Sequence, residues 1–332
     1  RADFDFAIRN GINFLDLYAS NPELRSNIGA ALAGRREKFV IQGHLCSVWE
    51  EGQYLRTRDP EKAQAAFDDL LARLGTDYVD IGMIHYVDAE DDLRKVLDGP
   101  ILQLALRLRS EGRLRHIGMS SHNPVVAHMA ARTGLIDVLM FSVNPCYDLL
   151  PPSDDVDTLW ADESYAQELH NIDPERQRLY EFCEREGVAI DVMKAYGGGD
   201  LLSGTNSPFG KPMTPVQCIE YALTRPGVAA VMAGCRSRTE IEAALAWCTA
   251  TAAQRDYTQA LTGLGRFSWE GHCMYCGHCA PCTAGIDIAS VNKYYNLTLA
   301  QDEVPETVRE HYNLLAHHAS ECIACGRCQS NC

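Results

Sequence analysis

The sequence has no apolar run long enough to span a bilayer, so no transmembrane helix is expected. It is also poor in basic residues, with 30 lysines and arginines against 45 aspartates and glutamates and a formal net charge of -15. Because a nucleic-acid partner requires a basic face, this balance argues against nucleic-acid binding. No G-x-G-x-x-G motif follows any early predicted strand, which argues against an open doubly wound dinucleotide fold.

Cysteine, by contrast, is abundant, since the chain has 14 and the stretch from Cys273 to Cys332 holds eight of them. The eight form two runs with gaps of two or three residues. In bacterial two-cluster ferredoxins the last cysteine of each run binds the other cluster. The spacing therefore predicts two [4Fe–4S] clusters, one held by Cys273, Cys276, Cys279 and Cys332, and the other by Cys322, Cys325, Cys328 and Cys282.

Two other roles of these cysteines compete with cluster binding. Two zinc sites of four cysteines each are one alternative, but structural zinc sites use separated pairs of ligands. A disulfide scaffold is the other, but such scaffolds suit small secreted domains and this chain has 332 residues. Cluster thiolates need a reducing compartment, so a cytoplasmic location is expected.

Seven short apolar runs, separated by helical patterns, recur before the cysteine-rich tail. Such runs are typical of parallel strands covered on both faces. They lie at 13–17, 39–45, 79–85, 114–121, 138–144, 188–195 and 228–234. The alternation predicts an α/β protein with a (β/α)8 TIM barrel whose first strand lies upstream of Arg1. Residues 1–265 are assigned to the barrel, and 266–332 to an α-helical, ferredoxin-like dicluster domain.

Helix starts are marked by an N-cap side chain followed by proline. Five such pairs begin at Asn21, Asp59, Asn123, Asp173 and Thr214. The segments 46–59 and 145–172 are interpreted as long loops after strands, and their aromatic residues favour a lid over the carboxyl mouth of the barrel.

The chain resembles the aldo/keto reductases that carry a C-terminal two-cluster ferredoxin-like domain, over nearly all of its length. Besides the cysteine runs, the resemblance rests on Gly11-Ile-Asn-Phe-Leu-Asp16, Asn27-Ile-Gly-Ala-Ala-Leu32, Asp77-Tyr-Val-Asp-Ile-Gly-Met-Ile-His85, Ile117-Gly-Met-Ser-Ser-His122 and Met193-Lys-Ala-Tyr-Gly-Gly198. It implies an enzyme that reduces carbonyls with NAD(P)H at the barrel mouth. There the family gathers an Asp, a Tyr, a Lys and a His, and the Tyr delivers the proton.

Carried over by position, the resemblance assigns Asp16 to the family aspartate and His85 to the family histidine. The tyrosine position is Asn21 and the lysine position is His44. An asparagine cannot donate a proton as an acid, and this one also fits a helix N-cap. Tyr18, Tyr86 or Tyr196 could supply the proton-donating phenol instead, and their spacing in the sequence does not distinguish among them.

His44 has two interpretations. Because histidine titrates near neutrality, it could act as a general acid toward a developing alkoxide. The alternative is a buried structural histidine with its hydrogen bonds satisfied.

For a nucleotide cofactor, the resemblance points to the turn before the helix that follows the last strand. Arg236 and Arg238 flank that helix start and would bind a phosphate of NAD(P)H, although surface arginines are the alternative. Ser120 and Asn144 match positions that face the nicotinamide. The family's adenine-binding Glu-Asn pair is Ala243-Ala244 here, which departs from the pattern.

Together these features favour an iron–sulfur oxidoreductase that acts on a small carbonyl or hydroxyl substrate. Its site would be bounded by Asp16, His44, His85, Asn144 and Lys194. Electrons would pass through the clusters, with a ferredoxin or flavoprotein as redox partner. NADPH-driven aldehyde reduction is expected to be weak because the phenol–lysine pair is replaced. The alternative is an electron-transfer subunit of a larger redox complex, with a non-catalytic barrel as scaffold.

Overall fold

The structure is a computed structural model that describes residues 2–261, 267–268, 273, 275–299 and 304–332. Its main sheet has seven strands in the order β1-β2-β5-β6-β7-β9-β10. Their bounds are β1 (Phe14–Leu17), β2 (Val40–Leu45), β5 (Val79–Ile84), β6 (Leu114–Ser121), β7 (Val138–Ser142), β9 (Ala189–Met193) and β10 (Val228–Val231). Each falls on a predicted run, which confirms the α/β class. The described residues form this seven-stranded sheet and not a closed barrel of eight strands, and the strand expected upstream of Arg1 stays a prediction.

The chain divides into two compact units. The first comprises Arg1–Phe141, Pro152–Val156 and Cys235–Ile241. The second comprises Ser142–Pro151, Asp157–Gly234 and Glu242–Cys332.

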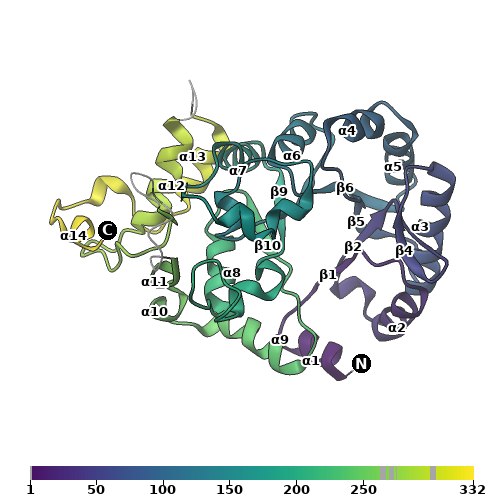
Figure 1. Cartoon of the computed structure of the whole chain (residues 1–332), viewed down its shortest axis with the longest axis horizontal. Coiled ribbons are helices and arrows are strands. Elements are labelled where there is room, and N and C mark those ends of the chain that lie inside the picture. The colour runs from purple at the N-terminus through teal and green to yellow at the C-terminus, as the bar shows by residue number, and fades with distance from the viewer. Residues whose placement is uncertain (1, 262–266, 269–272, 274, 300–303) are drawn as a thin grey trace. The chain divides into compact units, whose positions relative to one another are not determined.

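In the first unit, helices α3 and α5 pack against strands β2 and β6 respectively, and α6 also packs on β6 (Figure 1). The helices of this unit are α1 (Ala2–Arg9), α2 (Pro22–Leu32), α3 (Pro60–Leu74), α4 (Glu90–Leu97), α5 (Pro100–Ser110) and α6 (Pro124–Ala131), with a 3-10 turn η1 (Arg36–Lys38). Gly29 of α2 lies so close to α3 that a Cβ atom there would be 2.0 Å from the carbonyl oxygen of Arg73. Only glycine fits this contact.

The predicted helix starts are confirmed. The Asn21 side chain accepts a hydrogen bond from the Leu24 amide at 2.9 Å, so this residue is an N-cap. Side-chain caps are also made by Asp59, Asn123 and Asp173, and Thr214 forms a capping box with Gln217. Local sequence determines these caps, which is why the pattern could be recognised without the fold.

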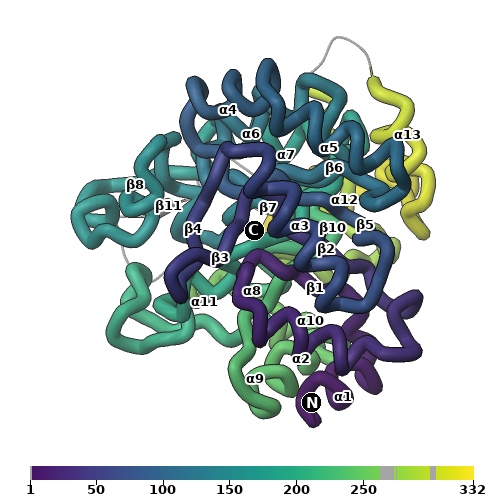
Figure 2. Tube along the Cα trace, turned by 90° about the vertical axis from the view of Figure 1, so that its right-hand side faces the viewer, coloured from purple at the N-terminus to yellow at the C-terminus, as the bar shows by residue number. Residues whose placement is uncertain are grey.

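The segment 46–59 is not the loop that the sequence analysis expected. It contains an antiparallel hairpin of β3 (Ser47–Glu50) and β4 (Gln53–Arg56), traced in dark blue in Figure 2. The two-residue turn uses Glu51 and Gly52, both with positive φ, at 51° and 79°. That turn geometry matches the right-handed twist of paired strands. Trp49 and Tyr54 are directly opposite each other across the hairpin.

The second unit contains β9, β10 and the helices that follow them. Its elements are α7 (Pro174–Glu186), α8 (Pro215–Leu223), α10 (Ala252–Arg255), α11 (Thr258–Leu261), α12 (Ile288–Leu299), α13 (Glu306–Asn313), α14 (Arg327–Asn331), and the 3-10 turns η2 (Tyr147–Leu149), η4 (Asp162–Tyr165), η5 (Gly197–Leu202), η6 (Ala246–Thr249) and η7 (Ala319–Glu321). A short pair joins β8 (Leu169–His170) to β11 (Phe267–Ser268). Helix α9 (Arg238–Leu245) and turn η3 (Val156–Leu159) cross the boundary of the units.

The segment between the cysteine runs is helical, as predicted. Helices α12 and α13 occupy it, and α13 packs against α7 of the same unit. Val308 of α13 is buried, and the His311 ring lies 2.8 Å from the buried Glu184 carboxylate of α7. The tail is therefore tied to the second unit by packing and by a polar contact.

A buried polar cluster lies in the second unit. Asp148 is fully buried and accepts hydrogen bonds from the hydroxyls of Tyr180 at 2.5 Å and Tyr221 at 2.7 Å. The guanidinium of Arg176, also buried, lies 3.6 Å from the same carboxylate. Burial raises the pKa of Asp148, while the positive charge of Arg176 acts in the opposite direction.

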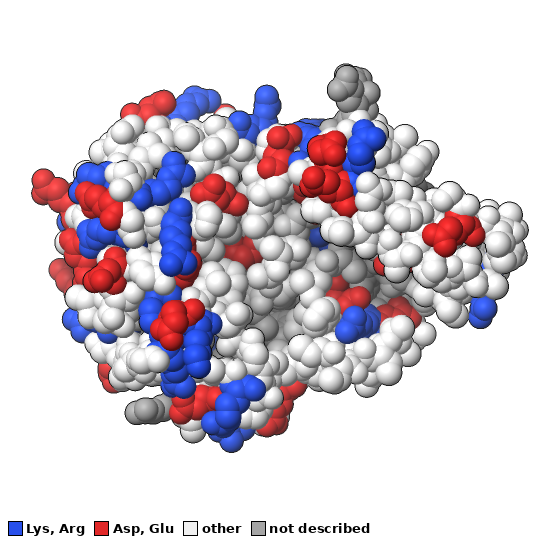
Figure 3. Space-filling view, turned by 180° about the vertical axis from the view of Figure 1, so that it is seen from behind, with Lys and Arg blue, Asp and Glu red and all other residues white. Residues whose placement is uncertain are grey.

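No helix among the described residues is both long and apolar enough to cross a membrane. On the face drawn in Figure 3, acidic and basic side chains are interspersed.

Candidate active site

The predicted residues Asp16, His44 and His85 come together in the first unit because three neighbouring parallel strands carry them. Asp16 is in β1, His44 in β2, and His85 directly follows β5. In the sheet Asp16 pairs with Gln42 of β2, and His44 pairs with Met83 of β5. Gln42 and His44 are two residues apart, so they point to the same face of the strand.

These side chains form a continuous hydrogen-bonded chain. The Nε2 atom of His44 lies 2.9 Å from Oδ1 of Asp16, and its Nδ1 atom lies 2.6 Å from Nδ1 of His85. Gln42 donates from Nε2 to the same Asp16 oxygen at 3.0 Å. His44 is 1% exposed, and a buried imidazole with both nitrogens engaged is held in one orientation. His44 is therefore structurally satisfied, and its role as a general acid stays a prediction.

This series of hydrogen bonds ends at a phenol that was not predicted from the sequence. The hydroxyl of Tyr54, in the hairpin, makes a short hydrogen bond with Nε2 of His85. The sequence had suggested Tyr18, Tyr86 and Tyr196 as replacement phenols instead. Tyr54 was missed because its contact depends on the hairpin. The sequence offered only Trp49 and Tyr54 on either side of Glu51-Gly52, a pair outside the usual two-residue hairpin turns.

The environment makes His85 hard to protonate. Burial, and then the charge of His44, lower its pKa to about 2, with smaller contributions from Arg58, His122 and Arg56. Burial also raises the pKa of Tyr54, although Arg56 and Arg58 act in the opposite direction. Near neutral pH His85 is therefore an uncharged imidazole, and Tyr54 carries its proton.

The backbone after β5 is fixed by two arginines. Tyr86 has a left-handed backbone, with φ of 53°, and its carbonyl accepts hydrogen bonds from Arg56 at 2.9 Å and Arg58 at 2.7 Å. Arg58 also donates to the His85 carbonyl at 2.9 Å and pairs with Asp92 at 2.6 Å. These contacts hold His85 in place, in the sparsely populated turn that follows the strand.

The residues expected to bind a nucleotide lie apart from this chain of contacts or are engaged by the protein itself. The Ser120 hydroxyl accepts from the Tyr86 amide at 2.7 Å. In the second unit, Asn144 donates to the Lys194 carbonyl at 2.9 Å and accepts from two backbone amides. Arg238 pairs with Asp3 at 3.2 Å, while the side chain of Arg236 is exposed.

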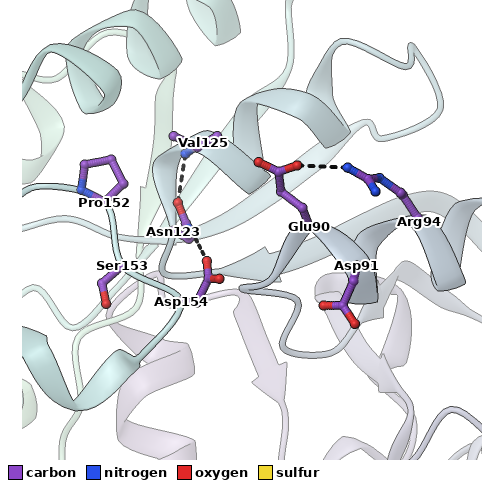
Figure 4. A pocket seen from close by; sticks show the side chains of 8 residues that line it. All are labelled: Glu90, Asp91, Arg94, Asn123, Val125, Pro152, Ser153 and Asp154. Atoms are coloured by element: carbon purple, nitrogen blue, oxygen red, sulfur yellow. Dashed lines mark hydrogen bonds and ion pairs between the residues drawn. The ribbon is translucent and has the colours of Figure 1, made fainter.

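A cavity of about 590 Å³ in the first unit lies elsewhere. Figure 4 shows that its polar side chains pair with one another, Glu90 with Arg94 and Asn123 with Asp154. Asp16, His44 and His85 are not in its lining.

All fourteen cysteines lie within the described ranges and are free thiols. Within those ranges, no three Cys, His, Asp or Glu side chains converge closely enough to hold one metal ion. The two runs nevertheless share a backbone pattern. Tyr275 and Ala324 precede the second cysteine of each run and have φ of 57° and 52°, and Gly277 and Gly326 follow it with φ of 76° and 72°.

Contacts also connect the two runs. Burial raises the pKa of Cys273 and of Cys276, and the negative charge of Cys332 contributes to the rise for both thiols. The terminal cysteine of the second run therefore lies near two cysteines of the first. At the end of the first run, Thr283 directly follows Cys282, and its hydroxyl lies 3.7 Å from Sγ of Cys325 in the second run.

The seven-stranded parallel sheet, with helices between its strands, has the fold of a partial α/β barrel. The sequence profile of the Aldo/keto reductase family matches residues 2–217, and the chain belongs to this family. It is 30% identical to an uncharacterized oxidoreductase of Bacillus subtilis over 41% of this chain and 44% of that protein. It is 24% identical to a D/L-glyceraldehyde reductase of Hypocrea jecorina over 64% of this chain and 65% of that protein.

The chain thus spans 44% to 65% of the length of these two curated relatives. Among solved structures, an aldo-keto reductase from Bacillus halodurans in its holo form is similar with a TM-score of 0.59 and 22% identity, over 82% of this chain and 89% of that one. A protein described as an aldo-keto reductase from Pseudomonas aeruginosa has a TM-score of 0.55 and 19% identity, over 79% and 82% of the two chains. These structures support the fold.

Proposed function

We propose that this oxidoreductase acts on a small organic carbonyl or hydroxyl compound beside His85 and exchanges electrons through two [4Fe–4S] clusters. The clusters would be held by Cys273, Cys276, Cys279 with Cys332, and by Cys322, Cys325, Cys328 with Cys282. When bound, such clusters transfer electrons one at a time.

The electron-transfer part of the proposal rests on one observation, namely that residues of each cysteine run lie near residues of the other run. Cys332 lies near Cys273 and Cys276, and Cys325 lies near the residue after Cys282. Crosswise ligation, in which each run supplies its last cysteine to the other cluster, requires cysteines of the two runs to lie near each other in this way. The repeated left-handed residues around Cys276 and Cys325 give both runs the same turn, and the soft thiolate donors suit iron–sulfur clusters.

The substrate part rests on family membership and on His85. The Hypocrea jecorina relative is named a D/L-glyceraldehyde reductase, so small aldehydes such as glyceraldehyde are the first substrates to test. A hydride from NAD(P)H is the family's usual electron source. Ser120, Asn144 and Arg238 already use hydrogen-bonding groups within the protein, which favours a ferredoxin or flavoprotein as donor.

Metal analysis of anaerobically purified protein tests the clusters. About eight iron atoms per chain are expected, four for each cubane. Crosswise ligation further predicts that Cys332→Ser weakens the cluster of the first run, whereas Cys282→Ser weakens that of the second. Cys248, an exposed cysteine outside both runs, provides the matched control Cys248→Ser, which should keep all the iron. Bound zinc with no broad visible absorbance would rule the clusters out.

A further inference from the structure

We propose that Tyr54 is the residue that exchanges a proton with the substrate oxygen, and that His85, His44 and Asp16 relay that proton. The proposal rests on the proposed function only for the identity of the substrate. The hydrogen-bonded chain itself is a property of the first unit, with bonds from Asp16 to His44, from His44 to His85, and from His85 to Tyr54.

Tyr54 and His44 of the relay differ in exposure. Tyr54 is 38% exposed, and Trp49, opposite it in the hairpin, is 36% exposed. His44 is only 1% exposed. A substrate can therefore reach the phenol at one end, while the imidazole of His44 lies in the interior.

When both histidines are neutral, every hydrogen bond has a fixed direction. The Asp16 carboxylate can only accept, so His44 must carry its proton on Nε2. Its bare Nδ1 then accepts from Nδ1–H of His85, and the bare Nε2 of His85 accepts from the Tyr54 hydroxyl. In this state the Tyr54 proton points to His85 and the oxygen presents a lone pair outward. The phenol is then ready to accept a proton from an alcohol.

One added proton reverses the direction of two bonds. With His44 as imidazolium, its Nδ1–H donates to His85, and His85 donates from Nε2 to the Tyr54 oxygen. The Tyr54 O–H is then free to donate outward. Transfer breaks this O–H bond and forms one on the substrate oxygen. Tyr54 regains a proton from His85, His85 takes one from His44, and the four side chains together lose one positive charge.

The two histidines of the relay have different charged neighbours. His85 faces Arg56 and Arg58 from the end of the hairpin and His122 from the end of β6. Tyr54 faces the same two arginines together with Tyr18 and Cys46. A positive charge on His85 would be repelled by these groups, whereas His44 is in direct contact with the Asp16 carboxylate. Asp92 and Asp88 balance Arg58 and His122.

The relay is tested first without turnover, by long-range ¹H–¹⁵N NMR of the full-length oxidised protein labelled at histidine. At about pH 8, His85 should carry its proton on Nδ1 and His44 on Nε2, because a lone histidine has no reason to adopt this pair of tautomers. A proton on Nε2 of neutral His85 would overturn the relay, since that nitrogen could not accept from Tyr54.

Activity provides the second test, with glyceraldehyde reduced by a one-electron donor and glycerol as the substrate for oxidation. Tyr54→Phe should lower kcat/KM by about 10²–10⁴-fold, the usual contribution of a general acid or base. Tyr78→Phe, a matched change at a tyrosine of the same unit that precedes β5, whereas His85 follows it, should leave the rate close to that of the unmodified protein. Full activity of Tyr54→Phe would refute the role of Tyr54 in the relay. Absence of turnover by the unmodified protein would refute the proposed function instead, and the NMR measurement would then still test the relay.

Discussion

His85 provides a prediction that depends on neither substrate nor cluster. Its pKa in the folded protein is lowered from 6.5 to about 2, chiefly by burial. Since the unfolded chain binds a proton below pH 6.5 and the folded chain does not, stability is lost as pH falls from about 6.5 toward 2. Between pH 7.5 and pH 5 this single group should lower the free energy of unfolding by about 2 kcal/mol, at about 1.4 kcal/mol per pH unit once the unfolded histidine is charged.

The assay is urea unfolding of the unmodified protein and of His85→Gln at both pH values. The variant should lose about 2 kcal/mol less over this interval, whatever its stability at pH 7.5. His116→Gln changes an exposed histidine of the same unit, 59% exposed at its side chain, and should behave like the unmodified protein. Two results would show the reasoning to be wrong. One is an equal loss of unfolding free energy in the unmodified protein and in His85→Gln between pH 7.5 and pH 5, and the other is an NMR titration of the His85 ring near pH 6.5.

Three further predictions concern stability. Arg176→Met removes the buried cation that lies 3.6 Å from the Asp148 carboxylate, and urea unfolding should show a loss of about 3–5 kcal/mol. Gly29→Ala forces a Cβ atom against the Arg73 carbonyl, and a loss of about 1–3 kcal/mol is expected in the same assay. Asp59→Ala removes the N-cap of α3 and should cost about 1 kcal/mol, seen as a lower Tm, with a wild-type value contradicting the role of this cap.

Much of the fold could be predicted from the sequence because its signals are local. The strands are short apolar runs, and the helix starts are an N-cap followed by proline, so neither depends on distant residues. The hairpin at 47–56 was missed because its turn, Glu51-Gly52, lacks the asparagine or aspartate that usually marks such turns.

The candidate site could be predicted only in part. Strand ends in a parallel sheet lie at one edge, so Asp16, His44 and His85 were expected to meet, and they do. The hydroxyl partner of His85 depends on the hairpin bringing Tyr54 back to β5, and no spacing along the chain predicts that contact. The ligand roles of the cysteines stay a prediction that the contacts between the runs support.

The central claim is that electrons held by the cysteine-rich tail reach a substrate beside His85. It is tested most directly by reducing the anaerobic protein with a one-electron donor, removing the excess, and adding glyceraldehyde while visible absorbance is followed. The account predicts that reduction bleaches the absorbance, that the aldehyde restores it, and that His85→Ala stays bleached. A protein that does not bleach, or one whose absorbance returns equally in His85→Ala, would contradict it.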